Sequence, residues 1–131
     1  GAAKGQEGLV ILTTLGTGIG SAFLYDGVLI PNTELGHLQM HGDSAEVRAS
    51  YGAKERGDLS WTKWAHRLQE YYAYLGLLLC PDLFGIGGGV SKNADECLPL
   101  LKLQTPTVPA VHRNNSGIIG AAALAAIGFH A

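Results

Sequence analysis

The sequence of 131 residues has the length of one ordinary domain, and 47% of its residues are hydrophobic, which is enough to bury a core. The formal net charge of −2 excludes the basic surface with which proteins bind nucleic acid or acidic membranes. Phosphate-bearing ligands are not excluded, because backbone amides can hold them. No apolar run reaches the roughly 20 residues that a membrane-spanning helix needs.

Cysteine and methionine usage indicates compartment and completeness. Cys80 and Cys97 form neither a CxxC pair nor a zinc spacing. Free thiols in apolar or helical surroundings fit a reducing cytosol, so we expect a cytoplasmic protein. The only methionine is Met40, and Gly1–Gly5 is typical of the end of a helix and its glycine cap. We therefore expect the chain to be part of a longer protein.

Three short strands are predicted at the start of the chain. Residues 9–15 are apolar and β-branched, and further apolar runs cover 21–25 and 28–30. Asp26-Gly27, between the second and third runs, is a strong hairpin signal. Tight connections between successive strands predict an antiparallel meander.

Two helices are predicted next. Asp43-Ser44-Ala45-Glu46 has the pattern of a capping box and predicts a short helix to about Ser50, followed by a polar loop. Ser60 fits the N-cap of a long amphipathic helix that Pro81 ends. The apolar residues of this helix recur at alternating steps of three and four: Trp61, Trp64, Leu68, Tyr71, Leu75 and Leu78.

The remaining sequence alternates strands with helices. Residues 83–86 predict a short buried strand, Ser91 caps a helix to about Leu98, 107–111 predicts another strand, and 117–127 predicts a final Ala-rich helix. Strands paired by hairpins that then alternate with helices predict an α/β fold, with a mixed sheet and helices on both faces.

The first glycine cluster, Gly16-Thr17-Gly18-Ile19-Gly20, lies between the first two strands. Alternate glycines allow the backbone to approach a ligand closely, and successive amides can bind an anion. The hydroxyls of Thr14 and Thr17 would be further donors. A hairpin turn that simply needs glycine explains the spacing as well. The cluster matches neither a Walker loop nor GxGxxG.

The second glycine cluster, Gly87-Gly88-Gly89, lies where a strand passes into a helix. Open α/β sheets bind ligands at such junctions, where strand ends and helix N-termini meet. A tight connection is the alternative explanation. Because three consecutive glycines exceed what a connection requires, we favour a ligand site.

A third candidate site is the loop Glu34-Leu35-Gly36-His37. A carboxylate and an imidazole on either side of a glycine turn suit the binding of vicinal hydroxyls, since the carboxylate accepts two hydrogen bonds and histidine donates or accepts. His37 alone would more simply be a structural histidine, and Glu46 is explained by the capping box. No Ser-His-Asp order or metal cluster is present in the sequence.

Together these motifs resemble the ROK family of sugar kinases and regulators. Residues 13–27 are similar to the family's second phosphate loop, 31–37 to its ExGH sugar-binding motif, 83–91 to its glycine-rich motif near the nucleotide, and 114–125 to its closing helix. The resemblance covers nearly the whole chain and keeps the order of the motifs.

The family's usual zinc motif, CxCGxxGCxE, is missing, because residues 40–46 contain no cysteine. The resemblance therefore implies no zinc. The glutamate that closes this motif contacts the sugar in the family, and Glu46 takes its place. The zinc-free version, with DLSWTKWA at 58–65 and KLQTPTVPA at 102–110, is similar to the subgroup that phosphorylates glucose with polyphosphate and often with ATP.

The resemblance implies an actin-like ATPase (ribonuclease H-like) fold of two domains facing a cleft. Residues 1–131 would be the C-terminal domain, and the N-terminal domain would be absent from the chain. Glu34, His37 and Glu46 would bind glucose hydroxyls. No catalytic residue is expected in this chain, because the aspartate that deprotonates the 6-hydroxyl would lie upstream. The residues expected to bind phosphate or nucleotide are Thr14, Gly16, Thr17, Gly18, Gly87, Gly88 and Gly89.

The resemblance also implies Mg²⁺ bound with ATP or polyphosphate, glucose as the acceptor, and a homodimer of the full-length protein. This chain alone would be inactive. Some ROK relatives are transcriptional regulators that sense sugars, so a sugar-sensing regulator stays open as an alternative. A folded, non-catalytic fragment is a third reading. The sequence decides neither the preferred donor nor the choice among glucose-like hexoses.

Overall fold

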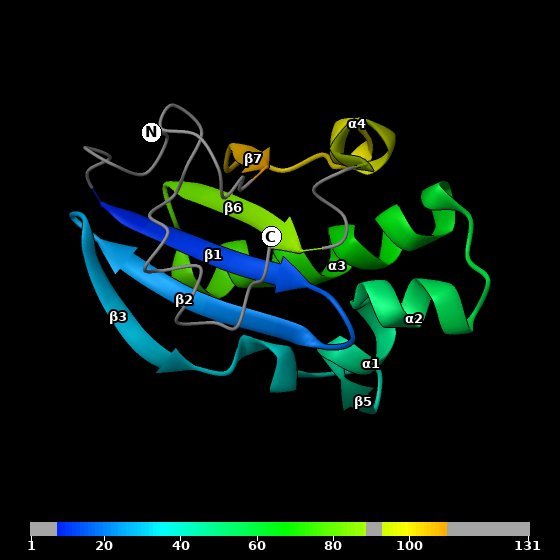
Figure 1. Cartoon of the computed structure of the whole chain (residues 1–131). Coiled ribbons are helices and arrows are strands. Elements are labelled where there is room, and N and C mark those ends of the chain that lie inside the picture. Colours follow the sequence, from blue (N-terminus) through cyan, green and yellow to red (C-terminus); the bar gives the residue numbers. More distant parts are fainter. Residues whose placement is uncertain (1–7, 89–92, 110–131) are drawn as a thin grey trace.

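The chain is described by a computed structural model for residues 8–88 and 93–109 (Figure 1). Strands β1 (Leu9–Leu15), β2 (Ile19–Tyr25) and β3 (Val28–Thr33) are antiparallel neighbours. The predicted meander is therefore confirmed, with the second and third strands longer than predicted.

Two further strands extend the sheet beyond the meander. β6 (Leu83–Gly88) pairs in parallel with β1, and β7 (Thr107–Pro109) pairs in parallel with β6. The sheet order is β3-β2-β1-β6-β7, so the prediction of a mixed sheet is confirmed. The predicted helix 117–127 lies outside the described residues, as does Ser91.

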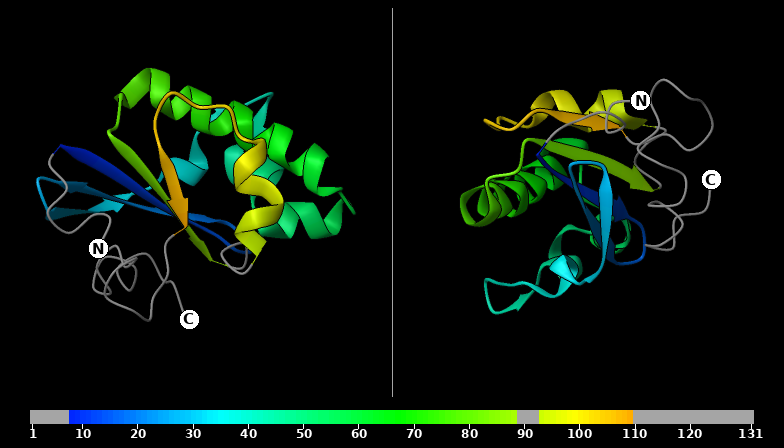
Figure 2. Two further views of the ribbon diagram at one scale, coloured as in Figure 1. Left: turned by 90° about the horizontal axis from the view of Figure 1, so that it is seen from above. Right: turned by 90° about the vertical axis from the view of Figure 1, so that its left-hand side faces the viewer.

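The long helix α3 (Trp61–Leu79) lies along one face of the sheet (Figure 2). The hydroxyl of Ser60 accepts a hydrogen bond from the Lys63 amide at 3.1 Å, which confirms the predicted N-cap. Cys80, with a left-handed φ of 48°, ends the helix directly before Pro81. The predicted start and end of this helix are both confirmed.

Helix α3 buries two side chains that were not predicted, Ala65 and Tyr72, and leaves the predicted Leu78 outside the core. Leu78 is 53% exposed, whereas Tyr72 is fully buried. Tyr72 lies one turn from Leu68 and reaches the hydroxyl of Thr13 on β1, so a hydrogen bond as well as apolar area draws it into the core. The other buried side chains of this helix are Trp64, Ala65, Leu68, Tyr71 and Leu75.

Two short helices precede α3. Helix α1 spans Ala45–Ala49, close to the prediction, but the predicted polar loop after it is wrong, because α2 spans Tyr51–Arg56. The buried hydroxyl of Ser50 caps α2 by accepting from the Ala53 amide at 3.0 Å. The polar composition that indicated a loop instead reflects a helix with one buried residue, Ala53, and a largely solvent-facing surface.

The smaller elements complete the chain. A 3₁₀ turn, η1 (Leu35–His37), leads into two very short strands, β4 (Gln39–Met40) and β5 (Asp43–Ser44), which were not predicted. After β6, α4 covers Ala94–Cys97. The helix predicted to reach Leu98 ends one residue earlier and continues as a second 3₁₀ turn, η3 (Leu98–Leu100), because proline fits the first turn of a helix.

Two adjacent tyrosines in the core differ in hydrogen bonding. The hydroxyl of Tyr72 lies 2.6 Å from that of Thr13, whereas the hydroxyl of Tyr71 has no partner within the described part of the chain. Burial raises the pKa of both hydroxyls well above its ordinary value, so both stay neutral. The two rings pack edge to face at 5.2 Å, in closely similar surroundings.

Replacing each tyrosine by phenylalanine separates the two situations. We expect Tyr72→Phe to lower the free energy of unfolding by about 1 kcal/mol, because it removes a buried hydrogen bond and leaves Thr13 with a weaker one. Tyr71→Phe should cause no loss, since its hydroxyl has nothing to lose. Urea unfolding of the two variants checks this, and an equal loss in both would contradict it.

Candidate functional site

The two glycine clusters predicted from the sequence lie at the same edge of the sheet. In the parallel pair of β1 and β6, Thr14 is opposite Gly87 and Leu15 is opposite Gly88. The first cluster follows Leu15 directly, so both clusters lie at the carboxyl ends of adjacent strands (Figure 1). This edge is where α/β sheets bind ligands. Gly89 lies outside the described residues.

Gly88 has a packing role that the sequence did not reveal. Its φ is +91°, and a Cβ atom added there would lie 2.6 Å from the carbonyl oxygen and 2.7 Å from the nitrogen of Leu15. Only glycine tolerates both the left-handed backbone and this backbone contact. Gly88 is therefore needed for the pairing of β6 with β1.

The first cluster forms one wall of a cavity of about 290 Å³. The amide of Gly16 donates to the carbonyl of Gly18 at 3.0 Å, so this amide is already occupied. The amides of Thr17 and Gly18 make no hydrogen bond within the described residues, and they are the donors left for an anion. The residues around the cavity are Thr14, Gly16, Thr17, Gly18, Ile19, Gly20 and Glu46.

Glu46 joins this loop to the predicted sugar-binding segment. Its Oε1 accepts a hydrogen bond from the Ile19 amide at 3.1 Å, and its Oε2 lies 3.5 Å from Nε2 of His37. The glutamate predicted by resemblance and the histidine of the ExGH motif are thus brought together beside the loop. One carboxylate holds the loop with one oxygen and faces the imidazole with the other.

The capping box predicted for Glu46 is wrong. Helix α1 begins one residue later than this motif requires, with Ser44 as an N-cap that makes no side-chain hydrogen bond. The amide of Ala45 instead donates to the carbonyl of Leu38 at 2.7 Å. With the helix start shifted by this contact, Glu46 takes the second helical position and can turn toward the loop.

The segment that carries Glu34 and His37 is a single 3₁₀ turn. The His37 amide donates to the carbonyl of Glu34 at 3.1 Å, and Ser21 of β2 accepts from the Leu35 amide at 3.1 Å. The imidazole of His37 is 65% exposed, and the exposed carboxylate of Glu34 makes no hydrogen bond or ion pair among the described residues. Both side chains are therefore accessible to a ligand, on a turn that the backbone fixes.

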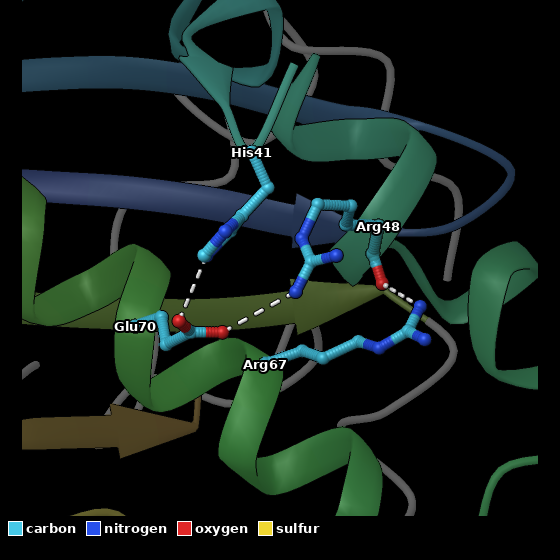
Figure 3. A network of polar contacts seen from close by, with 4 residues as sticks. All are labelled: His41, Arg48, Arg67 and Glu70. Carbon is cyan, nitrogen blue, oxygen red and sulfur yellow. Dashed lines mark hydrogen bonds and ion pairs between the residues drawn. The ribbon is translucent and has the colours of Figure 1, made fainter. Parts of the chain in front are cut away.

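A second polar network holds α1, and with it Glu46, against α3. One carboxylate oxygen of Glu70, on α3, lies 2.9 Å from Nε2 of His41, and the other accepts a hydrogen bond from Arg48 of α1 at 3.3 Å. Arg67, also on α3, donates to the backbone carbonyl of Arg48 at 3.1 Å (Figure 3). The hydrogen bond from His41, with smaller contributions from positive charges, holds the pKa of Glu70 below its ordinary value. Neither Arg67 nor Glu70 is among the apolar residues predicted for this helix.

Within residues 8–88 and 93–109, no three His, Cys, Asp or Glu side chains lie close enough together to hold a metal ion. None of the described helices is long and apolar enough to cross a membrane.

The chain was compared with known protein families, sequences and solved structures. No protein-family model matches the sequence. The chain is 49% identical over 122 residues to polyphosphate glucokinase from Mycobacterium tuberculosis. The matched segment covers 93% of this chain and 46% of that protein. It is 56% identical, with a TM-score of 0.82, to the inorganic polyphosphate/ATP-glucomannokinase from Arthrobacter sp., covering 90% of this chain and 47% of that one. By sequence, the chain is a relative of the polyphosphate glucokinases.

The fold is also that of more distant ROK sugar kinases. A ROK family glucokinase from Streptomyces griseus, solved with glucose and AMPPNP, has a TM-score of 0.64 at 16% identity and covers 95% of this chain and 60% of that one. This likeness concerns the fold alone. The predicted ROK resemblance and actin-like α/β fold are confirmed. The chain spans about half the length of the curated relatives that it matches.

The contact between Gly88 and Leu15 can be tested by substitution. We expect Gly88→Ala to lower the free energy of unfolding by about 2 kcal/mol or more, because it combines a left-handed φ with a backbone clash. Gly76→Ala is the matched control, since nothing lies near a Cβ there and alanine favours a helix interior by about 0.5–1 kcal/mol. Equal stabilities of the two variants in thermal unfolding would contradict the packing role.

The Glu70 network predicts a dependence of stability on pH. Because the pKa of Glu70 is lowered in the folded state, its contribution is fully present above the ordinary carboxyl value of 4.5 and is lost as the pH falls through the lowered value. Glu70→Gln should therefore lose stability at pH 7 and approach the parent near pH 3. Urea unfolding at both pH values measures this. Glu55→Gln, an exposed carboxyl, is the control, and a deficit for Glu70→Gln that is equal at both pH values would contradict the linkage.

Proposed function

We propose that the full-length protein to which this chain belongs is a glucokinase that transfers a phosphoryl group from polyphosphate or ATP to the 6-hydroxyl of glucose. This chain would be its C-terminal domain and would supply the sugar-binding and phosphate-binding loops. The observation that carries the proposal is Glu46, whose two oxygens contact the glycine loop and approach His37 at the same edge of the sheet. A phosphate site and a sugar site would thus lie side by side.

Each group has a role that follows from its chemistry. Glu34, His37 and the outer oxygen of Glu46 would bind sugar hydroxyls. Carboxylates accept hydrogen bonds from hydroxyls, and imidazole can donate or accept a hydrogen bond. The amides of Thr17 and Gly18, with the hydroxyls of Thr14 and Thr17, would hold the transferred phosphoryl group. Gly87 and Gly88 would border the donor.

The chemistry would depend on positioning and charge stabilisation. A Mg²⁺ ion on the donor would neutralise charge on its phosphates, and it needs no protein cage, because Mg²⁺ commonly keeps water and substrate phosphates as ligands. The base that removes the proton of the 6-hydroxyl would lie upstream of this chain. This chain alone would therefore not turn over, and closure of the two domains on the sugar would exclude water.

The production of glucose 6-phosphate tests the proposal. The full-length protein, given glucose and Mg²⁺, should form product from polyphosphate or ATP, and the present chain should form none. Glu34→Gln in the full-length protein should lower kcat/KM for glucose by roughly 100-fold without changing stability, because this carboxylate makes no protein contact in the described residues. Glu46→Gln should lower kcat/KM for glucose and also the free energy of unfolding, since the Glu46 carboxylate accepts a hydrogen bond from the loop.

Two further outcomes refine the test. No product with either donor would contradict the kinase assignment, and glucose binding without turnover would favour a sugar-sensing regulator.

The full-length protein should sediment as a homodimer, for which the exposed outer face of α3 offers apolar area at Tyr74, Leu77 and Leu78. The free thiols of Cys80 and Cys97 fit a cytoplasmic protein.

A further inference from the structure

Helix α2 touches the glycine loop directly. The amide of Gly52 donates to the carbonyl of Gly16 at 2.8 Å, and a Cβ atom on Gly52 would lie 3.2 Å from the carbonyl oxygen and 3.3 Å from the Cα of Thr17. Figure 1 shows α2 beside the tip of the β1–β2 hairpin. Glycine at position 52 permits this close contact without displacing the loop.

The guanidinium of Arg56 lies over the same contact. Arg56 is one helical turn beyond Gly52 and therefore on the same side of α2. Its Nη1 is 3.0 Å from the position that the Cβ of Gly52 would occupy, the point that is also 3.2 Å from the Thr17 carbonyl oxygen. The positive charge thus lies beside the loop whose residues Thr17 and Gly18 line the cavity.

Arg56 differs from the other described arginines in having no protein partner. Arg48 is paired with Glu70, and Arg67 donates to the carbonyl of Arg48. Lys54, also on α2, lies 4.2 Å above the ring of Trp61. Arg56 is exposed and makes no ion pair or hydrogen bond with the described residues, so its fork of N–H donors can bind an anion.

We propose that Arg56 binds the phosphate chain of the donor next to the phosphate that is transferred, and that it favours inorganic polyphosphate over ATP. The inference rests on the proposed function. The amides of Thr17 and Gly18 hold the reacting phosphate, and Arg56, at the outer side of the same loop, binds the phosphates that follow it. A linear polyanion that continues across α2 keeps this contact. A nucleotide that turns toward Gly87 and Gly88 has only two further phosphates and leaves it.

Direct binding tests this role without relying on turnover. In calorimetric titrations of the full-length protein with inorganic polyphosphate, Arg56→Gln should weaken the affinity about tenfold, the loss expected for one charge-assisted phosphate contact. Arg56→Lys keeps the charge but not the fork and should fall between the two. Lys102→Gln, which removes an exposed positive charge beside α3 instead, should bind as the parent does. Equal affinities of Arg56→Gln and Lys102→Gln would overturn the proposal.

Kinetics separate donor binding from a structural effect. Arg56→Gln should raise the KM for polyphosphate about tenfold, while the KM for ATP, the KM for glucose and the melting temperature stay near the parent values. An equal rise for ATP and polyphosphate, or a fall in melting temperature that accounts for the loss, would overturn the inference. If the parent protein forms no glucose 6-phosphate, the kinase function fails, and the titrations still decide whether Arg56 binds polyphosphate.

Discussion

The parallel pairing of β1 with β6 is the constraint on which the rest of the site depends. It brings the carboxyl ends of two strands that are about 70 residues apart in the chain to one edge, and it requires glycine at position 88, where the backbone of Leu15 leaves no room for a side chain. The loop that follows Leu15 therefore starts from a fixed point. Thr14, the residue directly before Leu15, is buried and lines the cavity.

Glu46 links this loop to the turn that carries His37. Its carboxylate accepts a hydrogen bond from the Ile19 amide and lies near His37. The contacts of Glu70 with His41 and Arg48 hold helix α1, which carries Glu46. A charged group that bonds a backbone amide usually fixes geometry more strongly than a neutral one. The same group can therefore hold the loop and leave one oxygen directed outward.

The sequence predicted those features that depend on local chemistry. The meander followed from Asp26-Gly27 and its flanking apolar runs, and the start of α3 followed from Ser60, because hairpin turns and caps are decided within a few residues. The two glycine clusters were recognised as candidate sites, although the spacing could not show that they meet. Resemblance, and not spacing, indicated a role for Glu46.

The features that were missed depend on contacts that the local sequence pattern does not reveal. Glu46 fitted a capping box, and only the bond from Ala45 to Leu38 moves the helix start and frees its carboxylate. Tyr72 lay off the predicted stripe of α3 because the stripe counts apolar area and not the hydroxyl of Thr13. A helix such as α2, with six residues and one buried side chain, has too little amphipathic pattern to be told from a loop.

The shortness and polarity that concealed α2 also suit it to the position it takes. A longer apolar helix would have to bury a full face against the sheet, whereas α2 is anchored by a few contacts, among them the cap at Ser50, the buried Ala53 and the edge-to-face contact of Tyr51 with Trp64 at 5.6 Å. Its remaining surface is free to face the glycine loop. Gly52 gives up helix propensity in the middle of so short a helix, at a cost of about 1 kcal/mol, and it permits the close contact with Thr17. A glycine that weakens the helix and tightens its contact with the loop indicates that the approach itself, and the charge that Arg56 brings with it, is what this segment provides.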